Sequence, residues 1–163
     1  MKIVYLIRHA KSSWEDPTLP DELRPILPKG VKKTKKISDY LFENNFFPDI
    51  IISSHAKRAI ETANLVAKKL KYPESKINIE EKIYHNGIDG YFETIYSTPE
   101  LFESIMIFGH NPTITNFANY FLKNLDDYIP TSGLIILKFD TNKWTDIANA
   151  DLLDYKCIYP KQL

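Results

Sequence analysis

Short apolar runs alternate along the chain with longer amphipathic stretches, and this alternation predicts an α/β fold. Residues 2–7, 49–53 and 104–108 are apolar on both faces, which is typical of strands in the middle of a parallel sheet. Residues 133–139 show a fourth clear strand pattern. Weaker strand patterns are found at residues 77–80, 144–147 and 154–158.

Helical spacing of apolar residues separates these strands. Residues 29–44 place Val31, Ile37, Tyr40 and Leu41 on one face and lysines on the other, as in a helix packed on a core. A second helix is predicted over residues 56–71, and residues 99–103 are expected to begin or continue a short one.

Prolines define two further segments. Residues 11–28 contain four of the ten prolines and predict a long ordered loop, which in a compact domain is usually functional. Asn111 precedes Pro112, an N-cap residue followed by the favoured first-turn proline, so a helix is expected from there to about residue 123. Strands that alternate with helices predict a three-layer α/β/α sandwich with a mostly parallel central sheet.

The composition is that of an ordinary globular protein and narrows the functional classes. With 163 residues the chain is expected to form a single domain over residues 1–163. The formal net charge is zero, so neither a nucleic acid nor a membrane is expected as a partner. Cys157 is the only cysteine, which excludes an internal disulfide and a thiolate metal cluster. The first apolar run ends at Arg8, too early for a signal segment or a membrane span, so a cytoplasmic protein is expected.

Ionisable side chains follow three of the apolar runs. Arg8 and His9 end the first run, and His110 follows the third. Arg58 lies near the start of the helix that follows the second run. Because ligands of open α/β sheets bind beyond the carboxyl ends of the strands, these four residues are expected to meet at one edge of the sheet.

Two arginines and two histidines suit the transfer of a phosphoryl group. The guanidinium forks of Arg8 and Arg58 match phosphate oxygens, and helix N-termini add N–H donors. A neutral histidine nitrogen can attack phosphorus and hold the group covalently, and nearby arginines would lower its pKa. The second histidine can donate a hydrogen bond to the phosphoryl oxygens in the transition state. A metal site is not expected, because the arginines would repel a divalent cation.

Three motifs in order carry a resemblance to a known family. They are Arg8-His9-Ala10-Lys11-Ser12-Ser13-Trp14, Ser53-Ser54-His55-Ala56-Lys57-Arg58-Ala59-Ile60-Glu61-Thr62-Ala63 and Gly109-His110-Asn111-Pro112. They are similar to the Arg-His-Gly, Ser-Ser-x-x-x-Arg-Ala-x-x-Thr-Ala and Gly-His-Asn-Pro motifs of the histidine phosphatase superfamily, which has the phosphoglycerate-mutase-like fold. The first motif resembles that of the small phosphohistidine phosphatases, the SixA-like branch. Together the three motifs span nearly the whole chain and are far more specific than any one of them.

The resemblance implies a role for each of the four residues. His9 would be the phosphate-accepting nucleophile, Arg8 and Arg58 would bind the phosphate, and His110 would complete the pocket. No metal and no cofactor is implied.

Two features depart from the family pattern. Ala10 stands where the family usually has glycine, and the chain between Arg58 and His110 is too short for a large substrate-recognising insertion. The family's proton donor is usually a carboxylate in that region. The candidates are Glu81 as the best positional match, with Glu80 and Asp89 after it, and a solvated carboxylate remains the alternative interpretation.

Four more residues are candidates for binding the substrate. Lys11 and Ser12 follow the nucleophile, and Asn111 follows the second histidine. Arg24 matches a segment of the small branch and either reaches the phosphate or braces the loop through Asp21.

The predicted activity is hydrolysis of phosphohistidine on a signalling or phosphorelay protein, through a covalent phosphohistidine on His9. A histidine ring is a better leaving group than a sugar alkoxide, so a small pocket without a clear acid favours a phosphoramidate. Two alternatives stay open. One is a phosphatase of small phosphate esters or nucleotides, which would need an acid such as Glu81, and the other is a phosphate-reading module without turnover. The oligomeric state is not set by the sequence.

Overall fold

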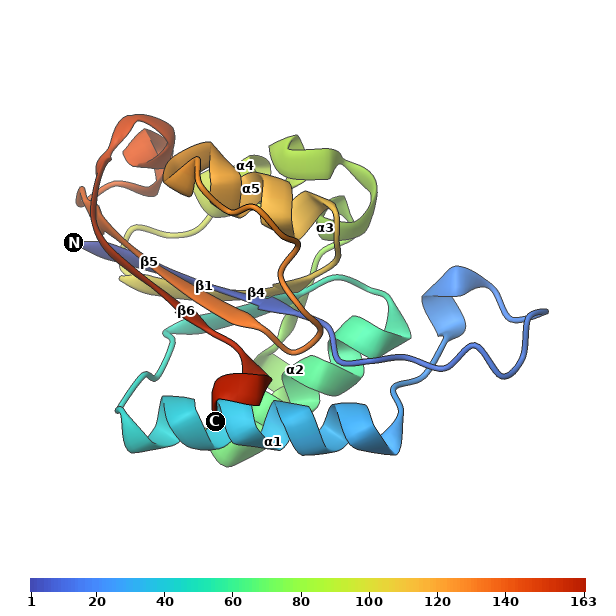
Figure 1. The fold of residues 1–163 in the computed structure, drawn as a ribbon. Helices are drawn as coiled ribbons and strands as arrows, with labels where there is room; N and C mark the ends of the chain where they lie inside the picture. Colours follow the sequence, from blue (N-terminus) through green and yellow to red (C-terminus); the bar gives the residue numbers. More distant parts are fainter.

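The computed structural model describes residues 1–163 as one six-stranded sheet with helices on both faces (Figure 1). The strands are β1 (Lys2–Arg8), β2 (Ile50–Ser53), β3 (Asn78–Ile79), β4 (Ser104–Gly109), β5 (Leu134–Asp140) and β6 (Asp151–Ile158). They lie in the order β3-β2-β4-β1-β5-β6. The first four pair in parallel, whereas β5 and β6 are antiparallel, so the sheet is mixed with a parallel centre.

The helices complete the expected three-layer α/β/α sandwich. Figure 1 shows α1 and α2 on one face of the sheet and α3, α4 and α5 on the other. Their bounds are α1 (Pro28–Glu43), α2 (Lys57–Lys69), α3 (Lys82–His85), α4 (Gly87–Tyr96) and α5 (Thr113–Leu122), with short 3-10 helices η1 (Asp21–Leu23), η2 (Glu74–Lys76), η3 (Trp144–Asn149) and η4 (Pro160–Gln162). No helix combines the length and the apolar character that a membrane crossing requires.

Two cores, one on each face of the sheet, explain the continuous apolar run of β1. Val4 and Leu6 belong to the core formed with α4 and α5, whereas Tyr5 and Ile7 belong to the core formed with α1 and α2. All four residues are buried. Because successive side chains of a strand point to opposite faces, a strand covered on both faces must be apolar at every position.

The segment between β1 and α1 is an ordered loop that folds back on itself. Ser12 and Ile26 form an isolated antiparallel bridge, and the Leu27 N–H donates to the Lys11 carbonyl at 2.8 Å. The loop carries η1, whose Asp21 accepts hydrogen bonds from the start of α2. This returning loop places polar side chains over the carboxyl ends of the central strands.

The apolar pattern of residues 144–147 forms η3 and not a strand. Trp144 is fully buried, and its Nε1–H donates to the Phe102 carbonyl at 2.9 Å. Residues 99–103 form a turn and not a helix, and the Glu100 carboxylate in this turn accepts the Trp144 N–H. Both predictions failed because the apolar side chains meet a partner far away along the chain, which local periodicity does not reveal.

Asn111 does not cap α5 as predicted. The helix begins at Thr113, with Pro112 at the N-cap position. The Asn111 amide instead donates to the Ile129 carbonyl at 2.8 Å and accepts the Thr115 hydroxyl at 2.6 Å. Asn111 therefore ties the start of α5 to the segment that precedes β5.

Candidate active site

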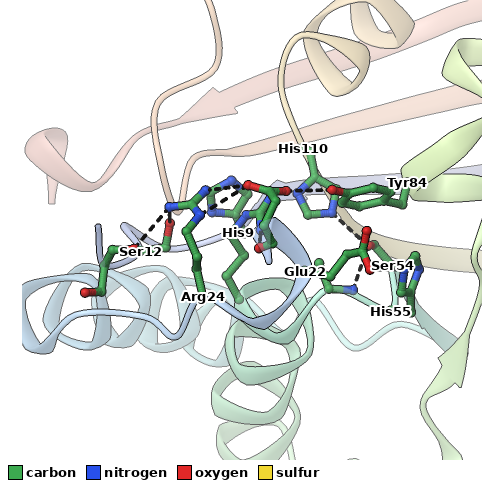
Figure 2. A network of polar contacts seen from close by, with 12 residues as sticks. His9, Ser12, Glu22, Arg24, Ser54, His55, Tyr84 and His110 are labelled. Atoms are coloured by element: carbon green, nitrogen blue, oxygen red, sulfur yellow. Dashed lines mark hydrogen bonds and ion pairs between the residues drawn. The ribbon is translucent and has the colours of Figure 1, made fainter. Parts of the chain in front are cut away.

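The register of β1 and β4 brings the two predicted histidines together. Arg8, the last residue of β1, lies opposite Gly109, the last residue of β4. His9 and His110 therefore leave neighbouring strands at the same level, and their ring centroids are 5.2 Å apart. Both residues are buried, and Figure 2 shows both in the middle of a network of polar contacts.

His9 is held as a neutral ring with a free Nε2. Its Nδ1 lies 2.7 Å from the carbonyl oxygen of Ala10, which can only accept, so Nδ1 carries the hydrogen. Burial lowers the pKa of His9 to about 4, although the bond to Ala10 acts in the opposite direction. The positive charges of Arg58, Arg8 and Arg24 contribute to the lowering. At neutral pH the ring thus presents an unprotonated nitrogen, which is the form a nucleophile requires.

His110 has the complementary character of a hydrogen-bond donor. Its Nε2 lies 2.7 Å from Ser54 Oγ, which also accepts the Ala56 N–H at 3.1 Å. The Ser54 hydroxyl has no other acceptor, so its hydrogen points to Nε2 and leaves Nδ1 of His110 as an N–H donor. Burial lowers the pKa of His110 to about 3, and the nearby His9 and Arg58 act in the same direction. The ring is therefore neutral, with Nδ1 buried and without a partner.

The two predicted phosphate-binding arginines also have unused donors. Arg8 Nη1 donates to the Ile129 carbonyl at 3.0 Å, and Arg58 uses both Nη atoms on Asp21. Nε of each arginine is buried without a partner. Burial and the charge of Arg58 lower the pKa of Arg8. Because buried polar groups are nearly always hydrogen-bonded in native proteins, three orphaned donors around His9 indicate a site for an anion.

Asp21 links Arg24 and Arg58 to Tyr84, which was not among the residues predicted for the site. Its Oδ2 accepts hydrogen bonds from Arg58 Nη2 at 2.8 Å and from the Tyr84 hydroxyl at 2.6 Å, and its Oδ1 accepts from Arg24. Partial burial acts to raise the pKa of Asp21, but the hydrogen bonds from Tyr84 and Arg58 outweigh it and hold the pKa well below its usual range. Tyr84 follows Ile83 in an apolar pattern typical of core packing, so nothing local distinguishes it.

Arg24 braces the loop, which was one of its two predicted roles. Its Nε and Nη2 donate to Asp21, and its Nη1 donates to Ser12 Oγ at 2.8 Å. Its guanidinium carbon stacks 3.5 Å from the ring centroid of Trp14. Ser12 is thus bound to Arg24, while Lys11 is exposed.

Glu81, the predicted proton donor, is not brought to the histidines. It precedes α3 with an exposed side chain that forms no hydrogen bond or ion pair with the site. No group of three or more His, Cys, Asp or Glu side chains is gathered as a metal site would need. A groove of about 620 Å³ lies elsewhere, between α1 and α2, and is lined by none of the site residues.

Comparison with known proteins finds a family model and a relative that match this chain. The model of the histidine phosphatase superfamily (branch 1) matches residues 4–84. An uncharacterised chloroplastic protein of Arabidopsis thaliana is 29% identical, over 86% of this chain and 68% of its own length.

Two solved structures are similar to this chain over nearly its full length. A structure named for the phosphohistidine phosphatase SixA of Agrobacterium tumefaciens is 27% identical, with a TM-score of 0.78 and coverage of 95% of this chain and 97% of its own. The protein histidine phosphatase SixA complexed with tungstate is 16% identical, with a TM-score of 0.82 and coverage of 98% of both chains, a likeness of fold.

Proposed function

Because this chain belongs to the histidine phosphatase superfamily, we propose that it hydrolyses phosphohistidine on a protein through a covalent phosphohistidine on His9. One observation carries the proposal. Three buried donors, Nε of Arg8, Nε of Arg58 and Nδ1 of His110, have no acceptor and surround a neutral histidine. A phosphoryl group supplies the missing acceptors and the electrophile that Nε2 of His9 can attack.

The reaction proceeds in two displacements at phosphorus. Nε2 of His9 forms the first bond while the leaving group departs on the opposite side, and water then attacks the phosphorylated His9. The two guanidinium groups and the His110 N–H stabilise the charge on the equatorial oxygens. These groups take the part that a metal ion plays in other phosphatases, so we expect the reaction to need none.

Two features support phosphohistidine as the substrate. Three carboxylates were candidates for the acid. Glu81 and Asp89 are exposed and Glu80 is half-buried, and none of them forms a hydrogen bond or an ion pair with His9 or His110. A sugar alkoxide needs a positioned acid, whereas an imidazole is a far better leaving group. The similarity to structures named as SixA points the same way.

The test compares wild type and His9→Ala on a phosphohistidine peptide, para-nitrophenyl phosphate and a sugar phosphate. We expect phosphohistidine to be turned over with the highest kcat/KM by wild type and not at all by the variant. Brief reaction of wild type with labelled substrate should leave acid-labile phosphate on the protein, which His9→Ala should lack. Lys36→Ala, which removes an exposed side chain of α1 outside the site, is the control.

Other results would change the proposal in defined ways. Turnover of the esters alone would make the protein a phosphatase of small metabolites and would make Glu81 the next residue to vary. Binding of phosphate without turnover of any substrate would indicate a phosphate-reading module.

A further inference from the structure

The polar groups of the site lie at two levels that differ in burial. The orphaned donors of Arg8, Arg58 and His110 form a buried floor. Toward solvent lie Asp21, whose side chain is 44% exposed, and the partly exposed Tyr84. A phosphohistidine carried on another protein must enter from solvent, so when its phosphoryl group lies on the floor its ring lies at the outer level.

Asp21 is an acceptor that joins the two sides of this outer level. It is bound by Arg24 and Arg58 on one side and by the Tyr84 hydroxyl on the other. Figure 2 shows Arg24 and Tyr84 approaching the network from opposite sides, with His9 between them. Two arginines and a phenol keep the carboxylate ionised, so it accepts hydrogen bonds and cannot serve as an acid.

Tyr84 provides a flat apolar surface beside this carboxylate. Its ring centroid lies 5.3 Å from that of His110 and 5.0 Å from that of His55. Figure 2 shows His110, Tyr84 and His55 following one another from the middle of the network toward its edge. Aromatic surfaces of this kind favour another flat ring, in stacked or edge-to-face contact.

We propose that Asp21 and Tyr84 form a subsite for the leaving group, which binds the imidazole ring of the substrate phosphohistidine. The substrate ring, protonated to the phosphoimidazolium cation, packs against Tyr84 and donates the N–H of its distal nitrogen, the one that carries no phosphorus, to Asp21. The Tyr84 hydroxyl then turns its hydrogen to a phosphoryl oxygen and leaves a lone pair of Asp21 Oδ2 for the substrate. This inference rests on the proposed function and names the residues that select its substrate.

The subsite removes the need for a general acid. Nε2 of His9 bonds to phosphorus as the P–N bond of the substrate breaks, and the electron pair of that bond returns to the substrate ring. A ring that holds a proton on its distal nitrogen therefore leaves as neutral imidazole, while His9 keeps its own Nδ1 hydrogen and becomes the phosphorylated cation. Water then displaces His9 from phosphorus and gives its proton to the phosphate or to solvent. An alkoxide gains nothing from Asp21, because it needs a proton on the leaving oxygen itself.

A second interpretation is that Asp21 only orients the guanidinium of Arg58. A positioning residue of that kind would affect every substrate alike and would also affect the binding of a bare oxyanion. A residue that contacts the leaving group affects only substrates that carry the ring.

The experiment therefore measures the ratio of kcat/KM for phosphohistidine to kcat/KM for acetyl phosphate. Phosphohistidine and acetyl phosphate carry the same phosphoryl group, but acetate has neither a ring nor a distal N–H, and it leaves without an acid. In Asp21→Asn we expect kcat/KM for phosphohistidine to fall about 10- to 100-fold further than kcat/KM for acetyl phosphate, the effect of losing a charged hydrogen bond. Tyr84→Leu should lower the ratio, whereas Tyr84→Phe, which keeps the ring, should lower it less.

Two further measurements separate the possible results. Asp16→Asn removes a carboxylate of the same loop that is bonded only to Thr18, so its ratio should equal that of wild type. An equal loss on both substrates in Asp21→Asn, together with weaker inhibition by tungstate, would show that Asp21 only orients Arg58. Full kcat/KM on both substrates in Asp21→Asn would also overturn the subsite. Wild type that hydrolyses acetyl phosphate but not phosphohistidine would reject the proposed function itself.

Discussion

His9 and His110 show how a single buried residue can link activity to stability. Each imidazole is neutral in the folded protein because burial and neighbouring positive charge lower its pKa, to about 4 for His9 and about 3 for His110. An unfolded chain has no such environment, and its histidines bind protons below about pH 6.5. The unfolded state therefore takes up more protons than the folded state as the pH falls, so the stability of the fold decreases from about pH 6.5 downward and levels off below the folded pKa values.

Replacing His9 by asparagine should flatten this pH dependence. The lowering from 6.5 to about 4 corresponds to roughly 3 kcal/mol of unfolding free energy lost between pH 7 and pH 4. We expect His9→Asn to lose less stability than wild type over that range, by up to this amount, in urea unfolding followed by circular dichroism. Asp21 adds its own loss only below about pH 4, where an unfolded aspartate becomes protonated. Parallel curves for wild type and variant would contradict the buried neutral state of His9.

Among single residues, the sequence predicted the site residues that follow the ends of strands, but not those that other segments of the chain bring to the site. Arg8, His9 and His110 could be predicted because a polar residue after a buried strand faces the same edge of the sheet. Tyr84 could not, because its place beside His110 depends on the path of the chain after β3. The need for glycine at position 109 is also visible only in the fold, because a side chain there would collide with the hydroxyl of the buried Tyr91.

At the scale of elements, the helices α1 and α2 hold the loop that carries His9. The Ala10 N–H donates to Thr62 Oγ1 of α2 at 2.9 Å, and the Thr62 hydroxyl donates to the Arg58 carbonyl at 2.7 Å. From the other side, Gly30 of α1 approaches so closely that a Cβ there would lie 2.8 Å from the Lys11 carbonyl oxygen and 3.1 Å from Ala10 Cβ. The alanine in place of the family's glycine is therefore accommodated beside a glycine of a neighbouring helix.

Thr62→Val should loosen this connection without changing the volume of the side chain. It leaves the buried Ala10 N–H without an acceptor, which costs about 1–3 kcal/mol of unfolding free energy. Because the Ala10 carbonyl holds the His9 ring, we also expect kcat/KM to fall about tenfold for any substrate, as a small misplacement of a nucleophile can cost even more. Thr62→Ser keeps the hydroxyl and should recover most of both losses. Full activity of Thr62→Val would show that the ring is positioned by other contacts.

The elements themselves were largely predictable, and the exceptions have a common cause. The strands and amphipathic helices around β1, β2 and β4 follow from apolar runs and 3.6-residue periodicity. The predictions of a strand at residues 144–147 and of a helix at residues 99–103 were wrong. Trp144 forms hydrogen bonds with Phe102 and Glu100, which lie more than 40 residues away along the chain. Short segments that pack on each other take their conformation from that contact and not from their own sequence.

At the scale of the whole molecule, the site exists only when distant parts of the chain have assembled. Its residues come from the end of β1, the loop with η1, the start of α2, the α3 turn and the end of β4. In the folded state this assembly gathers three buried donors without an acceptor, which are Nε of Arg8, Nε of Arg58 and Nδ1 of His110. An oxyanion that fills the floor should therefore stabilise the entire fold, because the unfolded chain offers it no comparable site.

Tungstate offers a direct measure of that stabilisation. At about 100 times its Kd, a ligand bound only by the folded state adds about 2.7 kcal/mol, which for a chain of this size raises Tm by roughly 5–10 °C. Arg58→Ala removes one of the floor donors and should show a much smaller rise at the same tungstate concentration, whatever its own Tm. Lys57→Ala, which removes an exposed neighbouring cation, should keep the full rise. If Arg58→Ala and wild type rise equally, tungstate binds elsewhere, and the three orphaned donors do not form the anion site from which the phosphatase mechanism was derived.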